Sequence, residues 1–167
     1  ASILAWLHFA ERLPLASIGL RRPTWKSPLY ALLAAVALLV IFFLDFAVIV
    51  PAFHLNVTTP NAVRNMILAQ PFLFRLFLVL RAAVVEEIIF RGYLIEKVRQ
   101  LTGSTVLAVI VSVAPFGYAH LSGWGPVQLI PVFGAAVVLA LLYVWKRDLP
   151  SNMLAHFLTD GAGFLLH

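Results

Sequence analysis

The sequence contains no cysteine, and this absence removes several kinds of chemistry at once. A disulfide framework, a thiolate nucleophile and a cysteine-ligated metal site all require that residue. Charged side chains are scarce as well, because Asp, Glu, Lys and Arg together make up 11% of the 167 residues, whereas soluble domains carry about 25%. Hydrophobic residues make up 62% of the chain, which predicts an integral membrane protein.

Several familiar catalytic motifs are also missing. The sequence has neither a glycine-rich phosphate-binding loop nor the HExxH motif of zinc proteases. No serine lies beside a histidine at a matched depth, so a covalent nucleophile is not evident. The net charge is +5, but the basic residues occupy short connectors between apolar runs, which indicates membrane topology and not a nucleic-acid surface. We expect no cofactor, no bound metal and no nucleic-acid partner.

The apolar runs predict an all-α fold, a polytopic transmembrane helical bundle of about five spans. Each run approaches the roughly 20 residues that a bilayer core requires. The expected spans cover residues 28–50, 71–95, 104–121, 127–145 and 150–166. They form a single domain over residues 28–167, preceded at 1–27 by an N-terminal segment that is either interfacial or the remnant of a truncated helix.

The positive charges distribute unevenly over the connectors of such a bundle. With five spans, one side of the membrane receives a single arginine, Arg64. The other side receives Arg12, Arg21, Arg22, Lys26, Lys97, Arg99, Lys146 and Arg147. Basic connectors stay in the cytoplasm, so we expect a bacterial inner-membrane protein whose basic connectors are cytoplasmic.

The second span contains two adjacent glutamates, Glu86 and Glu87, followed by Arg91. A charged side chain at the centre of a membrane helix costs about 2.5–3.5 kcal/mol on insertion scales. Residues four apart share a helix face, so Glu87 and Arg91 are expected to pair, whereas Glu86 points elsewhere. This arrangement neutralises one carboxylate and leaves its neighbour available as a general base.

Two later spans carry further polar pairs at a spacing of four residues. Phe116 and His120 share a face of the third span, and His156 and Asp160 share a face of the fifth. Polar groups in a membrane bundle face its interior, so the three helices are expected to bring these groups together. Counted along its helix, His120 lies deeper than the others, and either the kink expected at Pro115 or a tilt of the helix has to compensate.

Carboxylates and histidines in a pocket of low dielectric constant can activate water. Glu86 would take the proton, and His156 is the candidate donor to the tetrahedral oxyanion. The remaining intramembrane charges have a structural interpretation, since Asp45 and Arg81 fall at similar depths and are expected to form an ion pair.

Three motifs in this order resemble the CAAX protease and bacteriocin-processing family, also called the abortive-infection family. They are EExxxR at 86–91, FxxxH at 116–120 and HxxxD at 156–160. The flanking text at 15–23 and 134–160 is also similar to that family. The family comprises glutamic intramembrane endopeptidases and includes the type II CAAX prenyl endopeptidases, so the resemblance implies a peptide hydrolase.

The resemblance also implies a role for each motif residue. Glu86 and His120 would hold and deprotonate the hydrolytic water, and the Glu87–Arg91 ion pair would support them. His156 and the residue at 160 would bind the oxyanion. Many family members have asparagine where this chain has Asp160, and an ionised aspartate would repel an oxyanion. We therefore favour Asp160 as a charged partner that orients His156.

Three other functions remain open at this stage. Two glutamates and two histidines could instead hold zinc, or the polar cluster could belong to a non-catalytic membrane scaffold or immunity protein. A proton-coupled transporter is disfavoured, because no inverted repeat is visible. The expected partners of an endopeptidase are the lipid bilayer and a membrane-associated or lipidated protein or peptide. The sequence does not indicate its oligomeric state.

Overall fold

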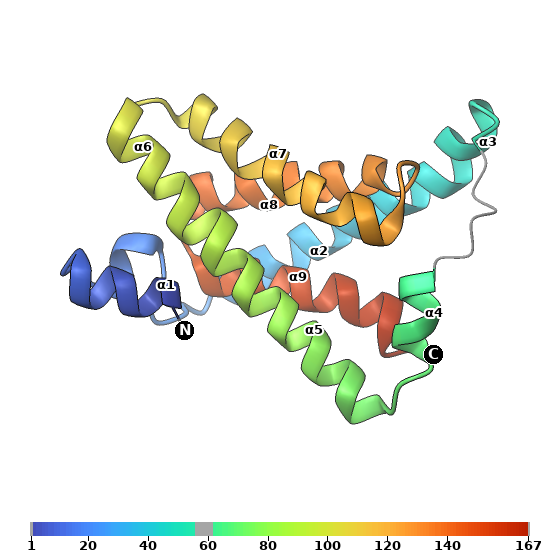
Figure 1. The fold of residues 1–167 in the computed structure, drawn as a ribbon, viewed down its shortest axis with the longest axis horizontal. Coiled ribbons are helices and arrows are strands. Elements are labelled where there is room, and N and C mark those ends of the chain that lie inside the picture. The colour runs from blue at the N-terminus through green and yellow to red at the C-terminus, as the bar shows by residue number, and fades with distance from the viewer. Residues whose placement is uncertain (1, 56–61, 167) are drawn as a thin grey trace.

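The computed structural model describes residues 2–55 and 62–166, and within them every regular element is helical (Figure 1). The predicted all-α class is therefore confirmed. In chain order the helices are α1 (Ser2–Ala5), the π-helix η1 (Trp6–Ala10), the 3₁₀-helix η2 (Leu15–Ile18), α2 (Ser27–Leu44), the π-helix η3 (Asp45–Ile49), α3 (Val50–Ala52), α4 (Ala62–Leu68), α5 (Phe72–Glu86), the π-helix η4 (Glu87–Ile95), α6 (Glu96–Thr102), α7 (Thr105–Trp124), α8 (Leu129–Lys146) and α9 (Leu149–Phe164).

Each of the five expected spans coincides with a helix or with helices that follow one another without a break. Three stretches are long and apolar enough to cross a membrane by length and composition, namely Ser27–Ala52, Thr105–Trp124 and Leu129–Lys146. The helix formed by α5, η4 and α6 carries more charge, and α9 has only 16 residues. The count of five membrane crossings therefore stays a prediction.

The helix ends follow from local sequence. Ser104 caps α7 by accepting a hydrogen bond from the backbone N–H of Leu107, and Asp148 caps α9 by accepting one from Ser151. Such caps satisfy N–H groups that have no partner inside the helix. Gly103 ends α6 at a φ of +71°, a left-handed conformation that favours glycine. The sharp turn here sends α7 back across the bundle.

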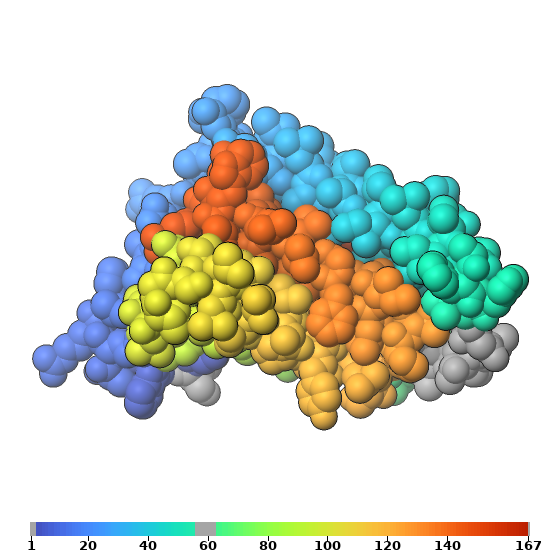
Figure 2. Space-filling model, turned by 90° about the horizontal axis from the view of Figure 1, so that it is seen from above, coloured from blue at the N-terminus to red at the C-terminus, as the bar shows by residue number. Residues whose placement is uncertain are grey.

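The helices pack so that α5 and α9 cross on one side of the bundle and α7, α8 and α2 lie on the other (Figure 1). Seen from above, the surface of α8 lies between α2 and α7 (Figure 2). The contacts agree, because α8 packs on both of those helices and α9 packs on both α2 and α5. Helices that are far apart in sequence, such as α2 and α9, therefore meet around a common interior.

The expected basic connectors meet at one end of the bundle. Arg147, after α8, pairs with Glu96 at the start of α6 with an N–O distance of 2.7 Å. Lys97 pairs with Glu11 in the N-terminal segment, and this hydrogen bond lowers the pKa of Glu11 below its ordinary value. Gly19 accepts a hydrogen bond from the backbone N–H of Leu149. The N-terminal segment thus packs directly on the bundle at this end.

The expected ion pair between Asp45 and Arg81 does not form. Asp45 is 1% exposed, and neither of its carboxyl oxygens has a hydrogen-bond partner in the described part of the chain. Arg81 is exposed and lines a cavity. The prediction matched the depths of the two residues along their helices, but depth does not determine which way a side chain faces.

Candidate active site

The two adjacent glutamates lie where α5 changes into the π-helix η4. Glu86 is the last residue of α5, and Glu87 is the first residue of η4. Short π-helical segments inside α-helices often occur at functional sites. The side chain of Glu87 is 0% exposed, whereas that of Glu86 is 28% exposed. The two carboxylates therefore occupy different environments although they are neighbours in sequence.

Glu87 lies at the centre of a sealed polar cluster. Its Oε1 accepts a hydrogen bond from Nη1 of Arg91 at 2.9 Å, so the predicted ion pair is confirmed. The same oxygen lies 3.0 Å from Nδ1 of His156. Arg91 is also fully buried, and its guanidinium carbon lies 4.2 Å from the ring centre of Phe116. The cluster thus joins η4 to α7 and α9.

A further member of this cluster, Asn152 on α9, is not identified by the sequence analysis. Its Nδ2 donates to the second oxygen of Glu87 at 3.2 Å and to the carbonyl of Leu139 at 2.7 Å. Asn152 is four residues before His156, on the same helix face. A polar side chain at that spacing from a candidate histidine is the signal that could have identified it.

Glu86 faces a different environment, a cavity of about 610 Å³ between the helices. Most of the lining is apolar. Its polar and charged lining residues come from α4, α5, α7, α9 and the turn before α8. They are Arg64, Arg81, Glu86, His120, Gln128, His156, Thr159 and Asp160. The cavity is not lined by Glu87, Arg91 or Asn152. The site therefore has an open side, whose residues line the cavity, and a sealed side, which contains these three residues.

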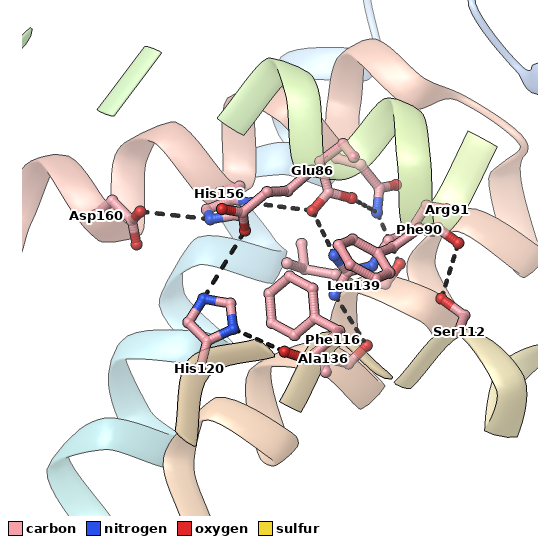
Figure 3. Close-up of polar contacts among 12 residues, drawn as sticks. Glu86, Phe90, Arg91, Ser112, Phe116, His120, Ala136, Leu139, His156 and Asp160 are labelled. Carbon is pink, nitrogen blue, oxygen red and sulfur yellow. Dashed lines mark hydrogen bonds and ion pairs between the residues drawn. The ribbon is translucent and has the colours of Figure 1, made fainter. Parts of the chain in front are cut away.

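His120 approaches Glu86 from α7, which continues as a helix through Pro115. Nε2 of His120 lies 4.0 Å from Oε2 of Glu86 (Figure 3). Nδ1 of the same ring lies 2.7 Å from the carbonyl oxygen of Phe116. A carbonyl can only accept, so Nδ1 carries a proton, and Nε2 presents a lone pair towards Glu86 whenever the ring is neutral.

This geometry leaves two hydrogen-bond acceptors facing each other. Oε2 of Glu86 has no hydrogen-bond partner among the described residues, and 4.0 Å is too long for a direct hydrogen bond to His120. Oε2 is itself buried, so a water molecule that lies about 2.8 Å from both atoms requires the neighbouring side chains to move apart. Such a water donates one O–H to the carboxylate and the other to the imidazole.

His156 links the sealed side of the site to the open side. Its Nδ1 contacts Glu87 at 3.0 Å, and its Nε2 lies 3.4 Å from Oδ2 of Asp160 (Figure 3). Asp160 lines the cavity and its side chain is 32% exposed. The spacing of four residues thus places this pair as the sequence predicted.

All six predicted site residues therefore belong to one connected cluster. Phe116 packs against this cluster, and the centre of its ring lies 4.6 Å from the centre of the His120 ring. Among the described residues, no group of three or more histidine, aspartate and glutamate side chains has an arrangement that could hold a metal ion. The cluster thus combines two hydrogen-bond acceptors for a water molecule, on Glu86 and His120, with a second histidine, His156, that lies between the carboxylates of Glu87 and Asp160.

Comparison with known proteins places this cluster in a family context. A family model described as Rce1-like type II CAAX prenyl endopeptidase matches residues 68–162, which include all six predicted site residues. The membrane-embedded CAAX protease MroQ of Staphylococcus aureus (strain USA300) is 26% identical over 106 residues, 62% of this chain and 43% of MroQ.

A second relative is the uncharacterized protein YpbD of Bacillus subtilis (strain 168). It is 33% identical over 86 residues, 52% of this chain and 41% of YpbD. The chain therefore spans less than half the length of these two curated relatives. No solved structure matches the chain.

Proposed function

This chain belongs to the Rce1-like type II CAAX prenyl endopeptidase family, and we propose that it is a glutamic-type intramembrane endopeptidase. The observation that carries the proposal is the contrast between the two glutamates. Glu86 faces a cavity and has His120 opposite it, while Glu87 is sealed behind it by Arg91, Asn152 and His156. A general base needs access to water, and of the two glutamates only Glu86 lines the cavity and has a partly exposed side chain.

In the proposed reaction, Glu86 and His120 hold the hydrolytic water between them. Glu86 takes a proton as the water oxygen bonds to the carbonyl carbon of the substrate, and the carbonyl oxygen becomes an oxyanion. Glu86 then returns the proton to the amide nitrogen as the carbon–nitrogen bond breaks. Both products leave with full valences, and no further reactant is required.

His156 is the proposed donor to the oxyanion. Its Nε2 faces the cavity and Asp160, and the distance of 3.4 Å to Asp160 leaves that N–H free to turn towards a substrate oxygen. Asp160 would hold the ring and favour its charged form. Donors fixed in a dry pocket stabilise a developing negative charge strongly, because they need no reorganisation when the charge appears.

The proposed substrate is a membrane-associated or lipidated protein or peptide, whose scissile segment enters the cavity from the lipid bilayer. Prenylated CAAX tails are the first class to test, because the family description names them. We further propose that the basic end of the bundle faces the cytoplasm of a bacterial inner membrane. The contacts of Glu96 with Arg147 and of Glu11 with Lys97 support a common side for these connectors.

The decisive experiment compares the protein termini in cells that carry the wild type or Glu86→Gln at matched expression. New termini should appear with the wild type and vanish with the variant, which keeps the shape of the side chain but cannot accept a proton. Identical sets of termini from the two folded proteins would contradict the proposal and favour a scaffold. A zinc protease would instead lose activity to a chelator and regain it with zinc.

A further inference from the structure

Asn152 is a member of the sealed cluster that takes no step in the proposed reaction. We propose that Asn152 is a positioning residue, which holds the Glu87 carboxylate as an acceptor on both oxygens and so anchors the Nδ1–H of a His156 ring that carries a proton on both nitrogens. The inference rests on the proposed function, because it assigns to Asn152 the orientation of the oxyanion donor.

The orientation of the Asn152 amide is determined by its neighbours. Its NH₂ group has two hydrogens, and both have acceptors, at 3.2 Å on Glu87 and at 2.7 Å on the carbonyl of Leu139. If the amide were turned over, its oxygen would face two other oxygens and lose both hydrogen bonds. Asn152 therefore acts purely as a donor in this cluster.

Packing alone does not account for an asparagine at this position. The residue is 0% exposed, and its Oδ1 has no hydrogen-bond partner in the described part of the chain. A leucine, which has the same branching at Cγ and is larger, would fill the space without burying an unpaired oxygen. The polar side chain is explained by what its Nδ2 does for Glu87.

The consequences pass from Glu87 to His156. Arg91 and Asn152 can only donate, so Glu87 must accept on both of its oxygens. His156 approaches one of those oxygens with Nδ1, which must then carry a proton. With Nδ1–H held by Glu87, the Nε2–H of the charged ring is the donor that faces Asp160 and the cavity. Loss of the Asn152 donor frees Glu87 to turn or to take a proton, and the ring of His156 is no longer held.

The test uses two substitutions of Asn152 and one matched control in the purified full chain, reconstituted in lipid vesicles. Asn152→Leu removes both donors, whereas Asn152→Asp keeps the shape and regains one O–H donor when it is protonated. Ser151→Ala is the control, since Ser151 is the adjacent buried residue and its hydroxyl bonds to Asp148 and the carbonyl of Ser27, away from Glu87.

The probe is a prenylated CAAX peptide with a fluorophore and a quencher on either side of the scissile bond. If the wild type does not cleave it, a peptide that spans a terminus from the cellular comparison replaces it.

We expect kcat to fall about 10- to 100-fold in both Asn152 variants at neutral pH while KM stays unchanged, because the residue orients a catalytic group and does not line the cavity. The ratio of the Asn152→Asp rate to the wild-type rate should rise as the pH is lowered, and the Asn152→Leu ratio should stay flat. Ser151→Ala should lower the melting temperature without changing kcat.

Two results would overturn the inference: a kcat in both Asn152 variants equal to that of Ser151→Ala, or a rate ratio for Asn152→Asp that does not change with pH. The second result decides the matter even if Asn152→Leu fails to fold. Failure of the proposed function is a separate outcome, since Glu86→Gln would then cleave the same peptide as fast as the wild type.

Discussion

Glu86 and Glu87 are neighbours in sequence, yet they belong to opposite sides of the site. On the sealed side, Glu87 receives hydrogen bonds from three residues and no part of its side chain is exposed. On the open side, Glu86 lines a cavity, and its buried Oε2 faces Nε2 of His120 without a hydrogen-bond partner in the described part of the chain. Adjacent helix positions point about 100° apart, and this rotation is enough to give one carboxylate a structural task and the other a chemical one.

The largest effect should come from Glu86→Gln on the open side. The amide cannot accept the proton of the water, so kcat should fall by about 100-fold or more. The unfolding temperature should stay the same or rise, because Oε2 of Glu86 makes no hydrogen bond within the described structure that the substitution would lose. Rates per folded molecule and thermal unfolding in detergent measure the two quantities. If Glu86→Gln lost as much stability as Glu87→Gln, the two carboxylates would not differ in their structural role, and the distinction between the two sides would be wrong.

The second effect, Glu87→Gln on the sealed side, should appear mainly in stability. It leaves Arg91 buried without its counter-charge, and breaking a buried ion pair by removing one partner costs about 3–5 kcal/mol. Denaturant unfolding of the purified protein measures this cost. Activity also falls, because His156 loses its anchor. A variant as stable as the wild type would show that the cluster around Glu87 does not hold the helices together.

How much of this contrast could be predicted from the sequence differs from residue to residue. The spacing of four predicted the contact of Glu87 with Arg91 and that of His156 with Asp160, because such spacing fixes a shared face within one helix. Contacts between helices depend on how each helix is rotated, which no spacing reveals. The expected pair of Asp45 with an arginine on another helix was wrong for that reason.

Two features of the sealed side, Asn152 and the π-helix η4, were not predicted from the sequence. In the sequence, Asn152 is one polar residue within a helix, and its role becomes visible only from its hydrogen bonds to Glu87 and Leu139. The π-helix that begins at Glu87 is likewise missing from the prediction, which expects one uniform helical span over residues 71–95.

Glu96 supplies a third carboxylate, at the basic end of the bundle, to compare with these two. It is 5% exposed and accepts hydrogen bonds from Arg147 and Tyr143. Glu96→Gln should cost about 1–3 kcal/mol of unfolding free energy, since it weakens hydrogen bonds to a charged group. The rate per folded molecule should not change, as measured with the same fluorogenic peptide. A large loss of rate would mean that the basic end and the cavity are coupled.

The smallest effect is expected for Asp160→Asn at the border of the two sides. The substitution replaces a charged partner of His156 with a neutral one, and charge-assisted hydrogen bonds are about twice as strong as neutral ones. We expect kcat to fall about tenfold, in steady-state assays with KM as the internal control. Retained or raised activity would show that Asp160 does not orient His156 through its charge.

The most direct test of the central idea, that Glu86 and His120 hold one water, is a double-mutant cycle on kcat. Glu86→Gln, His120→Ala and the double variant are measured in the same lipid vesicles, with unfolding temperatures as a check on folding. Two groups that act on one water lose their effect together, so the double variant should be no slower than Glu86→Gln alone. Losses that multiply would show that the two residues act independently, and would contradict a shared catalytic water.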